Sequence, residues 1–380
     1  MKIISIKAHQ LAVPLVHPYV LSKEYGVYST ATPVVVEVIS DEGIVGYGES
    51  DPWPLFTGDS AEIVMTIIEK HLGPMLIGAD PTNINEIHRL MDAIIRNQHM
   101  TKAAIDMACY DILGKSLDTP VHKLLGGKRR NSMRCMWSAG GSTPEEAAAS
   151  ILESKKLGYY GSMLKVGTAD YKIDVAKMKA VREAVGDDFP IICDANQGWD
   201  ISTAIKFCKE VEDCNVLFFE QPLQSWDVEG MAEVRKSINI PLSADEGVAT
   251  IQDARKLIEA HAVDIFSVKV SKNGGIAPAK EICEYAAVNG IKVFFNSMIE
   301  EGITEAASLH IGVTTENIVE GIGHAYFSPL RLDGDICDYY KQIHPDLGIT
   351  AISDKSGLGI ELDQNQMEKY TIGTVIIGKH

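Results

Sequence analysis

The sequence has no hydrophobic run of membrane-spanning length, no cysteine pair with C-x-x-C spacing and no excess of basic residues. A membrane-spanning helix needs about 20 apolar residues, whereas the apolar stretch Leu11–Val16 is short and is broken by Pro14. The 7 cysteines are scattered and odd in number, which fits free thiols in a reducing compartment better than disulfides or a zinc site. We therefore expect a cytoplasmic protein without a signal peptide.

Positive charge is scarce, because 35 Lys and Arg residues face 52 Asp and Glu residues, for a formal net charge of -17. Such an acidic surface disfavours nucleic acid and anionic membranes as partners. A small anionic substrate would need local positive charge or a metal ion to bind. The 46% of hydrophobic residues is typical of a soluble globular protein.

The first third of the chain predicts an α+β unit. Residues Met1–Val16 and Pro33–Gly48 are rich in Ile and Val, which predicts strands. The polar and aromatic sequence HPYVLSKEYGVYST between them predicts a loop too long for a tight turn. Three amphipathic helices are expected to follow, at Ser60–Leu72, Asn83–Arg96 and Thr101–Lys115.

From about Ser132 the sequence alternates short apolar strands with amphipathic helices, which indicates parallel βαβ units. Eight strand candidates suggest a closed (β/α) barrel, with an open doubly wound sheet as the alternative. We expect the strands at Arg134–Gly141, Ser162–Gly167, Ile191–Asn196, Val216–Pro222, Pro241–Gly247, Ile265–Ser271, Lys292–Met298 and Asn317–Ile322. The helices between them are expected at Pro144–Leu157, Asp174–Ala184, Ile201–Val211, Val228–Ser237, Ile251–Ala260, Ala277–Asn289 and Glu305–Thr314.

Carboxylates follow three consecutive strands of this predicted barrel, at Asp194, Glu220 and Asp245. Active sites of such barrels lie at the carboxyl ends of the strands, so the three side chains are expected to converge. Each one alone could simply cap the next helix. Three together would repel one another unless a cation lay between them. Oxygen ligands without His or Cys favour Mg2+, with Mn2+ as the alternative.

Lysines end the two strands that flank these carboxylates, Lys165 on the second and Lys269 on the sixth. Two surface lysines paired with nearby acids are the simpler interpretation of either one alone. Facing each other across a metal, they can serve as acid and base. One would remove a proton alpha to a carboxylate, the metal would stabilise the enediolate, and the other lysine would return the proton or stabilise charge.

The motifs DANQGW, FFEQPL, ADEG and SVKVSKNGG resemble the strand-end motifs of the enolase superfamily. AIDMACYDILGKSLDTPVHKLLGG resembles the final helix of the family's capping domain. The resemblance spans almost the whole chain. It implies a modified TIM barrel, (β/α)7β, with an α+β cap built from both ends of the chain. The corresponding boundaries are 1–127 for the cap, 128–355 for the barrel and 356–380 for a tail that returns to the cap.

By this resemblance Asp194, Glu220 and Asp245 are metal ligands, and Lys165 and Lys269 are the acid/base pair. A lysine on the sixth strand matches the muconate-lactonizing enzyme subgroup and not the mandelate-racemase subgroup with its His–Asp dyad. The subgroup's members usually form dimers or octamers, which implies a homo-oligomer.

Further residues are placed around this centre by the same resemblance. Asn196 and Glu246 would support the metal and the lysines, and the segments 19–30 and 51–60 would be specificity loops. The subgroup's K-x-K motif reads Met163-Leu164-Lys165 here, so its first lysine is absent. Candidate pocket residues are Tyr19, Tyr25, Trp53, Phe56, Met163, Asn296, Ser297, Glu300 and Tyr326. For the aromatic members, closing the cap over the barrel is the simpler role.

The substrate is expected to be a small carboxylate, and three reactions remain open. A racemase or epimerase of an amino-acid or proline derivative is favoured, because the loop 17–29 is similar to that of hydroxyproline and proline betaine epimerases. Muconate-like cycloisomerisation and dehydration of a hydroxy acid are the alternatives. Dipeptide epimerases typically carry Asp-x-Asp on the eighth strand, where we read Glu320-Gly321-Ile322. A barrel that binds metal without catalysis would be expected to have lost a ligand or a lysine.

Two other residues were weighed as acids or bases. His324 is expected to be a loop histidine after the eighth strand, and Lys272 a solvated loop residue.

Overall fold

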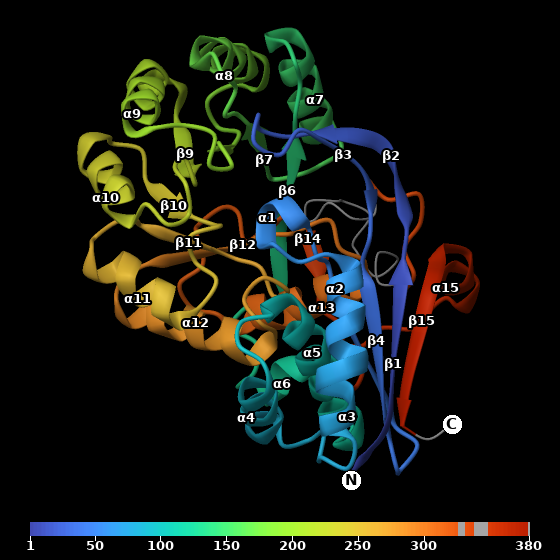
Figure 1. Cartoon of the computed structure of the whole chain (residues 1–380). Helices are drawn as coiled ribbons and strands as arrows, with labels where there is room; N and C mark the ends of the chain where they lie inside the picture. The colour runs from blue at the N-terminus through green and yellow to red at the C-terminus, as the bar shows by residue number, and fades with distance from the viewer. Residues whose placement is uncertain (326–330, 338–348, 379–380) are drawn as a thin grey trace.

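A computed structural model describes residues 1–325, 331–337 and 349–378, and its centre is a barrel of eight parallel strands (Figure 1). Each strand pairs with the next, and His324 of the last strand pairs with Cys135 of the first, so the sheet closes. This closure confirms the predicted barrel and excludes the open sheet. The strands are β6 (Ser132–Ala139), β7 (Gly161–Lys165), β8 (Ile191–Asp194), β9 (Val216–Glu220), β10 (Leu242–Ala244), β11 (Ile265–Val268), β12 (Lys292–Phe295) and β13 (His324–Ala325).

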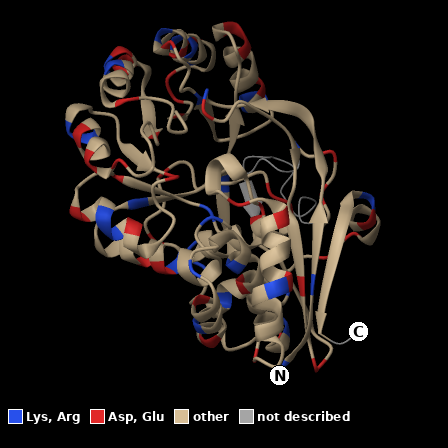
Figure 2. Cartoon of the chain, viewed as in Figure 1, with Lys and Arg blue, Asp and Glu red and all other residues tan. Residues whose placement is uncertain are grey.

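Seven helices connect these strands and surround the barrel, as the alternating pattern predicted (Figure 1). They are α7 (Pro144–Lys156), α8 (Tyr171–Val185), α9 (Ile201–Glu210), α10 (Val228–Ser237), α11 (Ile251–Glu259), α12 (Ile276–Val288) and α13 (Gly302–Thr314). A short 3-10 turn, η2, covers Glu212–Cys214. Lys, Arg, Asp and Glu residues are frequent along these outer helices, whereas the barrel strands carry few (Figure 2). Every residue of α13 is buried.

A second, antiparallel sheet of four strands forms the cap, in the order β15-β1-β4-β5. Its strands are β1 (Ile3–Leu11), β4 (Val34–Ser40), β5 (Val45–Ser50) and β15 (Thr371–Gly378). The pairing of β15 with β1 brings the two ends of the chain into one sheet (Figure 1). The adjoining short elements are α15 (Gln364–Tyr370) and β14 (Ile349–Ala351), the latter pairing with β6.

The cap also contains several helices, of which those within 61–76 and 99–116 pack on its sheet. The cap helices are α1 (Pro54–Thr57), α2 (Ala61–Ile67), the π-helix η1 (Ile68–Leu72), α3 (Gly73–Leu76), α4 (Ile84–Ile94), α5 (His99–Ser116) and α6 (Val121–Leu124). The expected helix Ser60–Leu72 is therefore α2 continued by one π-helical turn. Strand β5 lies directly on α5, because a Cβ atom at Gly48 would meet the Ala104 carbonyl oxygen at 1.8 Å.

Two buried carboxylates at the end of β5 fasten the cap to the barrel. Glu49 accepts hydrogen bonds from the backbone N–H groups of Glu301 (2.7 Å) and Thr304 (2.9 Å), at the start of α13. Asp51 accepts one from the N–H of Ile299 (2.8 Å), in the loop that follows β12. These bonds satisfy helix-terminal donors that would otherwise lack a partner. The loop after β12 is thus fixed by the cap as well as by its own strand.

The segment predicted as a long loop is instead a β-hairpin. Strands β2 (Val13–Val20) and β3 (Val27–Ala31) pair with each other, with Tyr19 opposite Tyr28. The prediction was wrong because Pro14 and Pro18 and the many polar residues weaken the usual strand pattern. Most β2 side chains past Leu15 are exposed, so burial on one face does not mark the strand.

The eighth strand also lies further along the chain than predicted. Of the expected strand Asn317–Ile322, only Ile318 makes an isolated bridge, to Val293. The strand that closes the barrel is β13, and it is only two residues long. Apolar character alone did not distinguish the two segments, because the choice depends on pairing with β12 and β6, which are distant in sequence.

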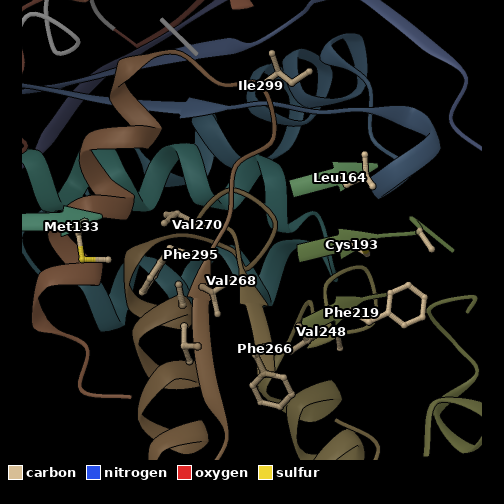
Figure 3. Close-up of a cluster of buried hydrophobic side chains, with 14 of the residues drawn as sticks. Met133, Leu164, Cys193, Phe219, Val248, Phe266, Val268, Val270, Phe295 and Ile299 are labelled. Atoms are coloured by element: carbon tan, nitrogen blue, oxygen red, sulfur yellow. The ribbon is translucent and has the colours of Figure 1, made fainter. Parts of the chain in front are cut away.

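The hydrophobic core continues from the barrel wall to the surrounding helices. The close-up in Figure 3 shows Leu164, Cys193 and Phe219 on the neighbouring strands β7, β8 and β9, and Phe266 on β11. Each of these side chains is fully buried. Burying a large apolar side chain contributes about 1.5–3 kcal/mol, so this layer stabilises the barrel wall. None of the described helices is long and apolar enough to cross a membrane.

Candidate active site

Strand register places the predicted functional residues side by side at the carboxyl end of the barrel. Lys165 pairs with Asp194 and Asp194 pairs with Glu220, so three neighbouring strands end in a row of charged side chains. Asp245 follows directly after the next strand, β10. The three carboxylates are fully buried. Strand register therefore brings the three carboxylates to the same end of the barrel.

Each outer carboxylate contacts a lysine. The Lys165 ammonium donates to the Asp194 carboxylate and, at 3.0 Å, to the side-chain oxygen of Asn196. The Lys269 ammonium lies 2.6 Å from Asp245 Oδ2. Because these carboxylates are turned towards the lysines, no three His, Cys, Asp or Glu side chains of the described residues surround one point. The two ammonium groups supply the positive charge at this end of the barrel.

Glu220, between the two pairs, has an incompletely satisfied carboxylate. Its Oε1 accepts a hydrogen bond from Asn296 Nδ2 (3.0 Å), whereas its buried Oε2 has no hydrogen-bond partner among the described residues. Burial and the charges of Asp194 and Asp245 raise the pKa of Glu220 well above its usual value. A buried anion without a partner is costly. A divalent cation would remove that cost, and the all-oxygen donor set fits Mg2+.

The lysines are held in their charged form. Burial alone would lower the pKa of Lys165, but the charge of Asp194 outweighs it and raises this pKa. The pKa of Lys269 is raised in the same way, chiefly by Asp245 against the effect of burial. Either lysine must lose its carboxylate partner before it can act as a base near neutral pH.

Lys272 is not the solvated loop residue that the sequence suggested. It is only 4% exposed, and its ammonium donates to the Asp245 carbonyl oxygen (2.6 Å), Asp245 Oδ1 (2.9 Å) and the Ser267 carbonyl oxygen (2.9 Å). Burial lowers its pKa, with Lys269 adding to that effect against the charge of Asp245. Asp245 thus has two ammonium partners, and their charges outweigh burial and keep its pKa below the usual value.

A hydrogen-bond chain links the hairpin to Lys165. The Tyr25 hydroxyl donates to Glu246 Oε1 (2.8 Å), which also accepts from Asn196 Nδ2 (3.2 Å). Asn196 in turn accepts from Lys165. Burial, together with Asp245 and Asp194, raises the pKa of Glu246 to about 8. Gln197, which the sequence reasoning missed, donates to the Tyr25 hydroxyl (2.7 Å).

The lysines line a narrow cavity of about 20 Å³ under the cap. Five of the predicted pocket residues line it, namely Tyr19, Trp53, Phe56, Asn296 and Ser297, together with Asn196. Its apolar wall also contains Leu21, Met298 and Ile299, which the sequence reasoning missed because no motif marks them. Tyr326 lies outside the described residues.

Three predicted pocket residues do not line this cavity. Met163 points into the barrel and packs with Met136 and Ile192. Tyr25 lies behind Trp53, with ring centroids 5.1 Å apart. Glu300 is buried outside the lining and accepts a hydrogen bond from the Ser297 hydroxyl (2.8 Å), a residue of the cavity wall.

His324 lies within β13 and not after it. It is fully buried, contacts the Ser308 hydroxyl at 2.6 Å, and burial lowers its pKa to about 4. It is therefore a neutral core histidine. With β13 at this position, the residues Glu320–Ile322 precede the eighth strand, and their lack of Asp-x-Asp no longer argues against dipeptide substrates.

A closed (β/α)7β barrel with acidic and lysine side chains at the strand ends has the architecture of the enolase superfamily. The protein-family model described as "Enolase C-terminal domain-like" matches residues 146–366 of this chain. The N-terminal domain model of the mandelate racemase / muconate lactonizing enzyme family matches residues 3–126. The chain belongs to this family, as the sequence motifs implied.

Relatives with assigned reactions cover nearly the whole chain. N-succinyl-L-Arg/Lys racemase of Bacillus cereus is 35% identical over 98% of both chains, and its crystal structure aligns with a TM-score of 0.93 at 33% identity over 99% of this chain and 100% of that one. Muconate cycloisomerase 1 of Rhodococcus opacus is 31% identical over 98% of this chain and 99% of its own length. These relatives are isomerases, and the chain is an isomerase of the enolase superfamily.

A dipeptide epimerase from Cytophaga hutchinsonii supplies a structural neighbour with ligands. Its crystal structure, complexed with Mg and the dipeptide D-Ala-L-Val, aligns with a TM-score of 0.91 at 27% identity, over 99% of this chain and 100% of that one.

Proposed function

We propose that this protein is a Mg2+-dependent racemase or epimerase that moves the proton alpha to the carboxylate of an N-acylated amino acid. The observation that carries the proposal is that two lysines face one cavity from opposite ends of the carboxylate row. Lys165 contacts Asp194, Lys269 contacts Asp245, and both lysines line the cavity. Removing a proton on one face and returning it on the other requires two such groups.

In this proposal Asp194, Glu220 and Asp245 hold the metal, and Mn2+ can replace Mg2+. The cation, when bound, polarises the substrate carboxylate and stabilises the charge that develops as the proton leaves. One lysine, as the neutral amine, takes the α-proton, and the other, as the ammonium, supplies a proton to the opposite face. Asn196 orients Lys165 through the bond to its Nζ (3.0 Å). The aromatic and apolar cavity wall excludes water from the lysines.

The substrate class is supported by the relatives. An N-succinyl amino acid and a dipeptide share an acylated amino nitrogen next to the α-carbon, and proteins with these substrates in their names align over nearly the whole chain. Among the described residues, the cavity lining contains no Asp or Glu that would attract a free ammonium group. A neutral, acylated nitrogen is therefore favoured over a free amino group.

The test is α-proton exchange in D2O, followed by NMR on both enantiomers of N-succinyl amino acids, dipeptides, N-methylated prolines and hydroxy acids, and on muconate. We expect Mg2+-dependent exchange with inversion on one N-acyl class. Lys165→Ala and Lys269→Ala should each reduce inversion at least 10³-fold, a loss typical of removing a general acid or base. Lactone formation from muconate would instead favour a cycloisomerase, and loss of water from a hydroxy acid a dehydratase. Exchange that persists after both substitutions would contradict the proposed roles.

A further inference from the structure

The cap places an aromatic ring directly on one of the two lysines. The Lys269 ammonium lies 4.1 Å from the centroid of the Phe56 ring. Its other neighbour is Asp245 Oδ2, at 2.6 Å. The ammonium is thus held between a carboxylate of the barrel and a ring of the cap. A cation over a ring face is attracted by the ring's quadrupole, most strongly where water is excluded.

Phe56 is itself fixed by other rings. Its ring stacks on that of Trp53, with the ring centroids 6.3 Å apart and an interplanar angle of 10°. Its centroid lies 5.8 Å from that of Tyr25 in the hairpin. Trp53 also contacts Tyr28, at 4.8 Å. Three other rings from two separate cap segments therefore determine where the face of Phe56 lies. A position fixed by packing in this way suits a group that must hold another side chain in place.

Lys165 has a different environment. Its contacts are polar, to Asp194 and Asn196, and within the described part of the chain no aromatic ring lies over its ammonium. The two lysines are therefore not equivalent with respect to the cap. Of the two lysines, Phe56 contacts Lys269, and no substrate group is needed for that contact.

We propose that Phe56 is a positioning residue for Lys269, so that the cap controls proton transfer on one face of the substrate more than on the other. This inference rests on the proposed function for its catalytic consequence. The contact itself rests on the geometry alone. Phe56 holds the ammonium near the α-carbon and limits its other rotamers, whereas the position of Lys165 depends on Asn196.

The steady-state rates cannot reveal this asymmetry, because the ratio of kcat/KM for the two enantiomers is fixed by the equilibrium constant. Exchange of the α-proton without inversion is not so constrained, since it needs only the lysine on one face. Lys269→Ala identifies the enantiomer whose exchange depends on Lys269. For Phe56→Leu we expect exchange with retention to fall roughly tenfold on that same enantiomer, and less than threefold on the other.

Two matched variants separate the ring contact from general packing. Phe56→Tyr keeps the ring face and should retain exchange within about threefold of the wild type. Leu55 lies on the same short helix and is 61% exposed, so Leu55→Ala should leave the exchange rate of both enantiomers unchanged. If Phe56→Leu slowed exchange with retention equally on both enantiomers, or did not slow it at all, the proposal would be overturned.

A second measurement does not depend on turnover. Reductive methylation of the metal-loaded protein, quantified by mass spectrometry, reports how freely each lysine meets a small reagent. Phe56→Leu should raise the labelling rate of Lys269 at least threefold and leave that of Lys165 unchanged. If labelling changes as expected but the wild type exchanges none of the substrates, the proposed function fails and the positioning contact stands. If labelling of Lys269 is unchanged, the positioning role is wrong.

Discussion

Among single residues, Lys272 shows how the barrel keeps a buried charge in a fixed place. Two of its three acceptors are backbone carbonyl oxygens, of Asp245 and Ser267, on adjacent strands. Unlike Lys269, it cannot leave Asp245 without also giving up hydrogen bonds to two backbone carbonyl oxygens. We infer that it stays beside Asp245 whichever ion or substrate is bound.

Replacing Lys272 should therefore destabilise the fold. Lys272→Met leaves the buried Asp245 carboxylate with one ammonium fewer and removes a donor from two backbone carbonyl groups. We expect the free energy of unfolding, measured by urea titration, to fall by about 3–5 kcal/mol. Lys256→Met is the control, because that side chain is 66% exposed and its ion pair with Asp253 is weak, so its effect should stay within about 0.5 kcal/mol. Similar values for the two variants would show that Lys272 is not a structural cation.

The sequence identified strand-end residues better than their surroundings. Asp194, Glu220, Asp245, Lys165 and Lys269 were predictable because parallel strands all end at one side of the barrel. Burial depends on what packs above a loop, and no local pattern contains that information.

Lys272 and Glu300 illustrate this limit, because both lie in loops after strands, where the sequence predicted a solvated lysine and a candidate pocket residue. The structure buries Lys272 under the neighbouring strands and Glu300 beneath the cap.

At the level of elements, a pair of stacked histidines joins three segments of the chain. The ring centroids of His122 in α6 and His310 in α13 lie 5.3 Å apart, and His310 Nε2 contacts the Leu358 carbonyl oxygen at 3.1 Å. Asp354 and Lys128 are the charged groups beside them. Burial lowers the pKa of His310 to about 3 and also lowers that of His122. Both rings are therefore neutral at pH 7.

This pair predicts a loss of stability in acid. A histidine whose pKa is depressed on folding binds protons better when unfolded, so its contribution is complete above pH 6.5 and is lost as pH falls towards 3. For His310 alone, the free energy of unfolding should fall by about 2–3 kcal/mol between pH 7 and pH 4.5. Urea titrations of His310→Gln at the same two pH values should show a smaller fall. An equal fall in both proteins would exclude this pair as the cause.

Element types were predicted well where short apolar strands and longer helices alternate at regular intervals along the chain. The seven barrel helices and strands β6 to β12 lie close to their expected ranges. The hairpin and β13 were misplaced because both depend on partners distant in the chain. β13, with two residues, has almost no local signal, and its position is set by Phe295 and Cys135 across the barrel seam.

For the whole molecule, the acidic charge and the buried carboxylates predict that a divalent cation stabilises the fold. Binding to the folded state alone adds about 2.7 kcal/mol at a concentration 100 times the Kd. Mg2+ should therefore raise the Tm of the wild type by several degrees, as measured by calorimetry. Glu220→Gln should abolish most of this shift, whereas Glu316→Gln, on the surface, should keep it. Equal shifts in the two variants would place the ion elsewhere.

The pairing of β1 with β15 sets an order of events during synthesis. The first strand of the cap sheet hydrogen-bonds to residues 371–378, so about 360 residues must be translated after β1 before its partner exists. At about 5–20 residues per second, β1 waits on the order of half a minute on the ribosome. The barrel strands can pair during that interval, and the edge of β1 stays open to chaperones or to other nascent chains.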